Sequence, residues 1–160
     1  MSGQARFKDR VCLVTGGSSG SGRACALARG AEGAKVVVAG RRQVRLDEVV
    51  ARIRAAGSEA VAVAGDVREE SACRAWVDAA VKTYGRLDGL VNAAGVMGGG
   101  GLLDLEPAEW DRMMDTNLRA MFLLTRAAAP ELIQRRGAVV NLSSVAGPRP
   151  YANLMGFVVS

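Results

Sequence analysis

A glycine-rich turn constrains the fold of this chain more than any other part of its sequence. The turn reads Thr15-Gly16-Gly17-Ser18-Ser19-Gly20-Ser21-Gly22, and it lies between an apolar run at 11–14 and a helix-forming stretch at 23–29. Glycine suits backbone angles that exclude side chains, and it lets a phosphate approach the N–H groups that begin a helix. The turn predicts a nucleotide phosphate site after a first strand, although an ordinary strand-to-helix turn would use the same residues.

The remaining segments predict an α/β fold. Short strands rich in valine and alanine are expected at about 10–15, 35–39, 60–64, 87–92 and 137–142, with helices between them, as in parallel strands covered on both faces. Right-handed crossovers then predict a doubly wound parallel sheet of Rossmann type, with strand order 3-2-1-4-5 and one domain over residues 1–160. Ligands of such sheets bind at the carboxyl ends of the strands, where the motifs described below fall.

The composition excludes several classes of site. The chain has no histidine, which excludes Ser-His-Asp hydrolysis and histidine-based zinc sites. Its cysteines are three in number and widely separated, so we expect buried free thiols in a reducing compartment and no metal site. The basic residues that give the net charge of +5 are scattered along the chain, so the sequence predicts no surface that binds nucleic acid.

No segment predicts membrane insertion or export. The sequence has no long uncharged apolar run, and residues 1–10 are polar and charged. We therefore expect a cytoplasmic protein with no membrane contact.

Two arginines follow the second predicted strand. A domain that binds NAD usually ends this strand with an acidic residue, which holds the ribose 2′-hydroxyl, but this chain has Arg41 and Arg42 there. A guanidinium pairs with a 2′-phosphate that a carboxylate would repel, so we predict NADP(H) in preference to NAD(H). A solvated pair at a helix start is the alternative.

The spacing of Gly16, Gly20 and Gly22 differs from the G-x-G-x-x-G fingerprint. It resembles the opening motif of the short-chain dehydrogenase/reductase family, whose members bind NAD(H) or NADP(H). Ser19 stands where many NADP-preferring members carry a basic residue. The resemblance implies that the cofactor is bound by Thr15, Gly16, Ser18, Ser19, Gly20, Gly22, Arg41, Arg42, Asp66, Val67, Asn92, Ala93, Ala94 and Gly95.

Two further motifs extend the resemblance along the chain. Asp66-Val67 is similar to the family's adenine contact, in which the carboxylate accepts a hydrogen bond from the adenine amino group, but an exposed turn aspartate is the alternative. The segment Asn92-Ala93-Ala94-Gly95 resembles the motif that stabilises the central strand and lets the backbone pass close to the cofactor.

The catalytic positions are matched in part. Asn117 resembles the helix asparagine that holds a water of the proton relay at a local kink, and Ser144 resembles the serine that hydrogen-bonds the substrate. From the residues alone, Asn117 could be a polar residue facing another helix and Ser144 part of a turn. The family's acid/base tyrosine position holds Phe157, natural or engineered, and the chain stops one residue before the position of the family's lysine.

We therefore expect an oxidoreductase that interconverts a carbonyl and a secondary alcohol, impaired because phenylalanine neither donates nor accepts a proton. The alternative is a non-catalytic nucleotide-binding or partner-binding protein. Relative to the family, the chain is C-terminally incomplete, so strand five is expected to be an uncovered sheet edge. Expected partners are a small carbonyl or alcohol substrate and either a second copy of the chain or a complementing C-terminal segment. The glycines after Met97 suggest a mobile segment.

Overall fold

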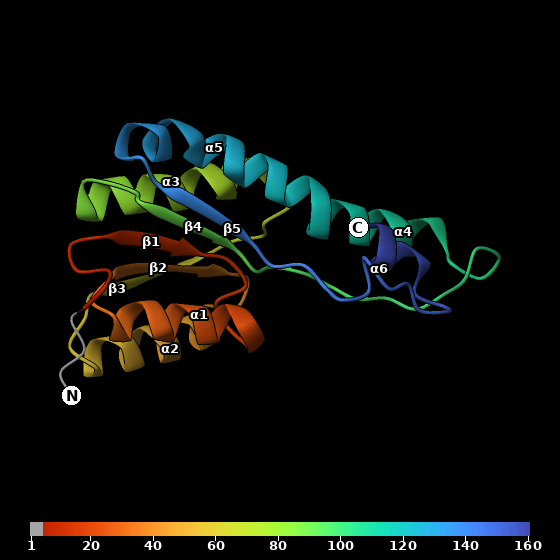
Figure 1. Ribbon diagram of the computed structural model, residues 1–160, viewed down its shortest axis with the longest axis horizontal. Helices are drawn as coiled ribbons and strands as arrows, with labels where there is room; N and C mark the ends of the chain where they lie inside the picture. The colour runs from red at the N-terminus through yellow and green to blue at the C-terminus, as the bar shows by residue number, and fades with distance from the viewer. Residues whose placement is uncertain (1–4) are drawn as a thin grey trace.

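A parallel sheet lies between two layers of helices in a computed structural model, which describes residues 5–160 (Figure 1). The strand order is β3-β2-β1-β4-β5, and all neighbours pair in parallel, which confirms the predicted fold and order. The strands are β1 (Val11–Val14), β2 (Lys35–Gly40), β3 (Ala60–Ala64), β4 (Gly89–Asn92) and β5 (Ala138–Asn141).

Alternating side chains of the strands bury both faces of the sheet. Along β1, Val11 and Leu13 pack on one face, whereas Cys12 and Val14 pack on the other. The first face is covered by α3 (Glu70–Tyr84) and α5 (Ala120–Arg135), and the second by α1 (Gly20–Ala31) and α2 (Gln43–Ala55). Because both faces are dry, the central strands are continuously apolar, as the sequence indicated.

A change of helix type interrupts the long helical segment after β4. Helix α4 (Pro107–Met113) begins with proline, whose fixed φ and missing N–H suit the first turn of a helix. A π-helical segment, η1 (Met114–Arg119), follows it and leads directly into α5. Wide turns of this kind occur often at functional sites, and this one holds Asn117.

Helices α4 and α6 (Met155–Val159) extend beyond the carboxyl ends of the strands (Figure 1). The glycine segment before α4 is joined to the start of α6, because the Gly100 N–H donates to the Asn153 carbonyl at 2.7 Å and the Met155 N–H donates to the Gly100 carbonyl at 3.2 Å. The mobility expected for this segment stays a prediction.

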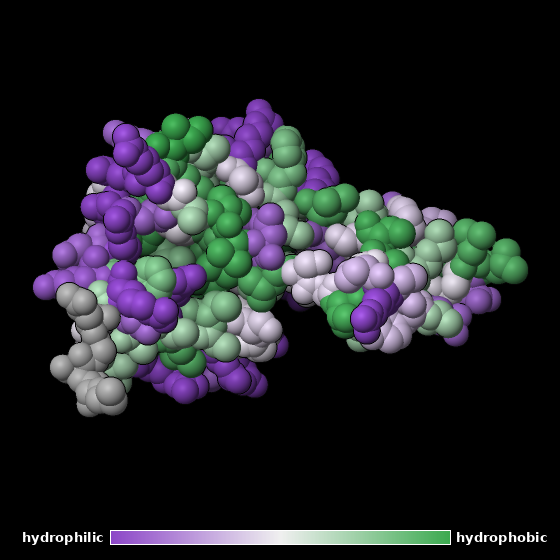
Figure 2. All heavy atoms as spheres, viewed as in Figure 1, coloured by the Kyte–Doolittle hydropathy of each residue, from purple (hydrophilic) through white to green (hydrophobic). Residues whose placement is uncertain are grey.

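Strand β5 forms an edge of the sheet among the described residues. Val139 and Val140 are 39% and 44% exposed, and Figure 2 shows apolar residues gathered over this side of the molecule. The uncovered edge expected from the sequence is therefore present in this part of the chain.

Candidate functional site

A cleft of about 400 Å³ lies at the carboxyl ends of the strands. It is bounded by the glycine turn and by the segments that follow β2, β3, β4 and β5. All of the predicted cofactor residues line it except Thr15 and Asn92: Gly16, Ser18, Ser19, Gly20, Gly22, Arg41, Arg42, Asp66, Val67, Ala93, Ala94 and Gly95. The fold thus brings together residues that lie up to about 80 positions apart along the chain.

The glycine turn forms a cradle in which Gly16 and Gly22 have no room for a side chain. Gly16 has a φ of +63°, and a Cβ atom there would lie 2.6 Å from the Ala93 carbonyl oxygen. A Cβ on Gly22 would collide with the backbone of Gly16. The turn leads into the N-terminus of α1, where free N–H groups and the helix dipole favour a negative group. These features fit a nucleotide phosphate.

Thr15 and Asn92 lie behind the cleft and hold its wall. The Thr15 hydroxyl accepts hydrogen bonds from the N–H groups of Ala93 at 3.1 Å and Ala94 at 3.2 Å. The Asn92 side chain donates to Oδ1 of Asn141 at 2.8 Å, and so ties β4 to β5. Both residues are buried, and they determine the path of the chain that follows β4.

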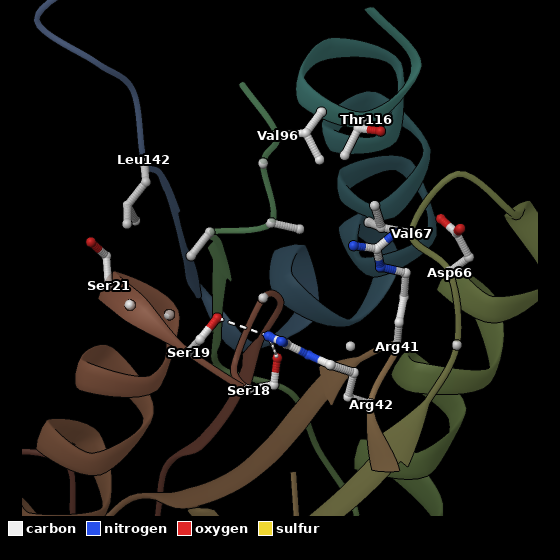
Figure 3. A pocket seen from close by; sticks show the side chains of 18 of the residues that line it. Ser18, Ser19, Ser21, Arg41, Arg42, Asp66, Val67, Val96, Thr116 and Leu142 are labelled. Carbon is white, nitrogen blue, oxygen red and sulfur yellow. Dashed lines mark hydrogen bonds between the residues drawn. The ribbon is translucent and has the colours of Figure 1, made fainter. Parts of the chain in front are cut away.

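The two arginines after β2 point in different directions (Figure 3). Nη2 of Arg42 donates to the hydroxyl oxygens of Ser18 at 3.0 Å and Ser19 at 3.1 Å, whereas the Arg41 side chain points toward Val67. Arg42 therefore places its charge beside Ser19, which carries no charge of its own. That placement depends on the proximity of β2 to the turn, which no local pattern reports.

Asp66 is held by an arginine that sequence reasoning missed. Arg68 bonds both carboxylate oxygens of Asp66, with Nη2 to Oδ2 at 2.7 Å, and the Arg68 N–H donates to Oδ1 at 3.0 Å. The hydrogen bonds from the Arg68 side chain hold the pKa of the Asp66 carboxyl below its usual value, and the nearby charge of Arg41 lowers it further. Asp66 is therefore an ionised acceptor at the rim of the cleft.

A second cavity of about 290 Å³ adjoins the first. Asn117, Ser144 and Phe157 all line it, although they come from η1, the loop after β5 and α6. The two cavities share five lining residues: Ala94, Gly95, Val96, Leu142 and Ser143. The structure thus brings the three catalytic candidates to one end of the candidate nucleotide cleft.

Asn117 is buried and makes three close polar contacts. Its Oδ1 accepts from the Val96 N–H at 2.8 Å, and its Nδ2 donates to the Val96 carbonyl at 2.9 Å and to Oγ of Ser160 at 2.8 Å. Asn117 therefore joins the π-helical turn to the segment after β4 and to the end of α6. Its place in a water relay stays a prediction.

The side chains of Ser144 and Phe157 differ in what they offer the cavity. The half-buried Ser144 hydroxyl accepts a hydrogen bond from the Ala146 N–H at 3.1 Å, and its own proton remains free to find an acceptor. Phe157 has no proton to give. Tyr151 is 53% exposed and lines neither cavity, so its phenol does not replace the one absent at 157.

Comparison with known proteins decides the family. A match to the family described as short chain dehydrogenase extends over residues 10–160, from the start of β1 to the end of α6. The chain belongs to the short-chain dehydrogenase/reductase family. Proteins of this family are oxidoreductases that bind a nicotinamide nucleotide, NAD or NADP, and act on small molecules.

Several dehydrogenases and reductases are similar in sequence to this chain. A 3beta-hydroxysteroid dehydrogenase of Mediterraneibacter gnavus is 37% identical over 97% of this chain and 56% of the relative. A 3-oxoacyl-[acyl-carrier-protein] reductase of Staphylococcus aureus is 39% identical over 86% of this chain and 57% of the relative. The crystal structure of an NAD⁺-bound xylitol dehydrogenase superposes with a TM-score of 0.92 at 29% identity, over 96% of this chain and 60% of that one. The chain spans little more than half the length of these relatives.

Two kinds of feature are absent from the part of the chain that the structure describes. Among residues 5–160, no helix combines the length and the apolar character that crossing a bilayer requires. The same residues contain no group of three metal-binding side chains of the kinds His, Cys, Asp or Glu.

Proposed function

We propose that this chain is the nucleotide-binding part of an NADP(H)-preferring oxidoreductase that interconverts a carbonyl and a secondary alcohol, and that residues 1–160 form one domain. One observation carries the proposal: the cleft that holds the glycine cradle and the arginines opens into the cavity lined by Asn117, Ser144 and Phe157. A nucleotide seated in the first would present its reactive end to the second.

The preference for NADP(H) rests on charge near the end of β2. Arg41 and Arg42 both line the cleft, and neither makes an ion pair with a described residue. Arg42 is held beside Ser18 and Ser19, and hydroxyl groups leave its charge unneutralised. A 2′-phosphate brings a negative charge that two guanidinium groups would bind, whereas a bare 2′-hydroxyl would gain far less from them.

Asp66 and Val67 are assigned to the adenine end of the site. The ionised Asp66 carboxylate accepts hydrogen bonds, which suits an exocyclic amino group. It lies on the β3 side of the cleft, beyond the arginines that would hold the ribose phosphate.

The second cavity is assigned to substrate. When bound, the nicotinamide nucleotide supplies or accepts the hydride, so the chain must position the substrate oxygen and move its proton. The free proton of Ser144 suits the substrate oxygen, and Asn117 keeps the cavity wall in place through Val96. Because Phe157 offers no proton, we propose that turnover by this chain is slow, by about 10²–10⁴-fold relative to a chain with a positioned acid/base.

The exposed β5 edge and the greater length of the relatives indicate what kind of partner this chain binds. Val139 and Val140 of the β5 edge are exposed, and the chain spans little more than half of its relatives. We propose that either a complementing C-terminal segment or a second copy of the chain covers this edge.

Calorimetric titration of the chain with NADPH and with NADH tests the proposed function. NADPH should bind the 160-residue chain at least about 10-fold more tightly, because hydrogen bonds to charged groups contribute about 1.5–3 kcal/mol each. The double variant Arg41→Ala, Arg42→Ala should lose this difference, and Arg45→Ala, an exposed arginine of α2 outside the cleft, should keep it. Equal affinity for the two nucleotides would refute the preference, and binding of neither would refute the site.

A further inference from the structure

The cavity assigned to substrate has an apolar lining with no charged side chain among residues 5–160. Its larger apolar side chains come from the segment after β4, the first turn of α5, the segment after β5, and α6: Val96, Met97, Met121, Leu142, Phe157 and Val158. The rest of the lining consists of glycine, alanine, serine and asparagine. Such a surface gains from covering an apolar group, whereas an anion placed against it would lose its water without a cation in return.

The arginine beside this cavity already has an acidic partner. Nη2 of Arg112 donates to the Met97 carbonyl at 3.2 Å, and Nε of the same side chain donates to Oε2 of Glu109 at 2.8 Å. Because the Glu109 carboxylate neutralises this guanidinium, Arg112 offers no free positive charge to an acidic substrate.

The polar side chains of the lining are partly used by the protein itself. The Asn117 amide nitrogen donates to a backbone carbonyl and to Oγ of Ser160, so its two N–H groups are both engaged. The Ser160 hydroxyl in turn donates to the Phe157 carbonyl at 3.4 Å. The hydroxyls of Ser143 and Ser144 remain, and they are neighbours on one segment. Two adjacent hydroxyls suit the single oxygen of a ketone or an alcohol.

We infer that the substrate is an aliphatic or alicyclic ketone, or the matching secondary alcohol, whose groups beside the reacting carbon are apolar and uncharged. This inference rests on the proposed function and narrows its substrate class. A 2-oxo acid would set a carboxylate against the apolar lining, and a polyol would set hydroxyl groups there without partners. The volume of about 290 Å³ suits a small molecule of this kind.

Two sets of ketones test the inference on the chain as it is. Hexan-2-one and 2-oxohexanoate differ in one group, because the second carries a carboxylate where the first carries a methyl group on the carbonyl. Butan-2-one, hexan-2-one and octan-2-one differ in chain length alone. Calorimetry first establishes that NADP⁺ is bound. Saturation-transfer NMR then measures the affinity of each ketone for the NADP⁺ form, which has no hydride to transfer, in about 0.15 M salt to screen distant charges.

The expected results separate this inference from the proposed function. Hexan-2-one should bind at least about 10-fold more tightly than 2-oxohexanoate, because the carboxylate would be desolvated without a partner. Affinity along the ketone series should rise about 2- to 4-fold with each added methylene group that the cavity covers. Equal affinity of the matched pair, or no gain with chain length, would overturn the inference while NADP⁺ binding upholds the nucleotide site. Failure of the chain to bind NADP⁺ would overturn the proposed function and the inference with it.

A pair of variants locates the effect in the cavity. Met97→Lys brings a positive charge to the lining and should raise the affinity for 2-oxohexanoate about 3- to 10-fold. Leu102→Lys makes the same charge change at another exposed apolar residue, outside both cavities, and should leave that affinity unchanged. Equal effects of the two changes would show that the charge acts from a distance, and would overturn the role given to the lining.

Discussion

The guanidinium of Arg42 donates a hydrogen bond to the hydroxyl of Ser19 at 3.1 Å, across 23 positions of the chain. The same Nη2 atom reaches Ser18 at 3.0 Å. A charge from the segment that joins β2 to α2 is thereby placed at the glycine turn, which has no charged residue of its own between Thr15 and Gly22.

This relationship predicts different results for two substitutions of Arg42. Arg42→Ala removes the charge and should weaken NADPH binding about 10-fold, with little effect on NADH. Arg42→Lys keeps a point charge, and should retain most of the preference although it loses the planar fork. The ratio of the two dissociation constants measures the effect, and a ratio in Arg42→Ala equal to the parent's would show that Arg42 serves the turn alone.

Asn117 should be important for stability because it bonds both backbone groups of Val96. Asn117→Ala removes two hydrogen bonds to the half-buried Val96, each of which contributes about 0.5–1.5 kcal/mol, so we expect the free energy of unfolding to fall by about 1–3 kcal/mol. Urea denaturation measures it. Leu118→Ala, an exposed neighbour in η1, is the control and should change stability by less than about 0.5 kcal/mol. Equal effects of the two changes would contradict the assignment.

Asp88 should make the free energy of unfolding depend on pH in the acidic range. At the amino end of the sheet its carboxylate accepts from the Val11 N–H at 2.9 Å, from Arg10 at 3.0 Å and from Arg86 at 2.7 Å. Burial by itself raises the pKa of Asp88, but the hydrogen bonds from Arg86, Val11 and Arg10 outweigh it, and the pKa falls below its ordinary value of 3.8.

A carboxyl with a lowered pKa in the folded state stabilises the fold above its ordinary pKa, and this contribution is lost as the pH falls through the lower folded-state value. We therefore expect Asp88→Asn to lower the free energy of unfolding by about 1–3 kcal/mol at pH 7, and the difference from the parent to shrink below pH 3.8. Urea unfolding at pH 7, 4 and 3 checks this. A constant difference across the series would exclude the carboxylate as its source.

Phe157 is the position at which chemistry should respond to one substitution. Phe157→Tyr places a phenol in the cavity that Ser144 and Asn117 line, and should increase alcohol oxidation with NADP⁺. Because no Lys or Arg is among the described residues that line this cavity, the phenol should keep a pKa of about 10, and the gain should grow as the pH rises from 7 toward 10. Rates with a set of small secondary alcohols measure it, and Tyr151→Phe is the control that should change nothing.

The cysteines should differ in their rates of alkylation. Burial raises the pKa of the Cys12 thiol and of the Cys73 thiol to about 11, and both are buried, whereas Cys25 is half-buried on α1. Because the thiolate is the reactive form, iodoacetamide at pH 8 should modify Cys25 first and the other two only after denaturation. Mass spectrometry of digested protein gives the order, and early modification of Cys73 would show that α3 opens locally.

The sequence by itself determined the architecture and predicted the place of the candidate site. The strands fall where valine-rich runs end at turns, the predicted order is the observed one, and the glycine turn, Asp66 and Gly95 all reach one cleft. These features follow from periodicity and from the rule that parallel strands end at one edge, and both are properties of local segments and their order.

Tertiary structure alone decided which side chains meet. Three contacts join segments that are distant along the chain: Arg42 with Ser19, Asn117 with Val96, and Asp88 with Val11. A long side chain has several rotamers of similar energy, and distant neighbours select among them. Local patterns therefore indicated where the cleft would form, and packing decided which charges and donors face it.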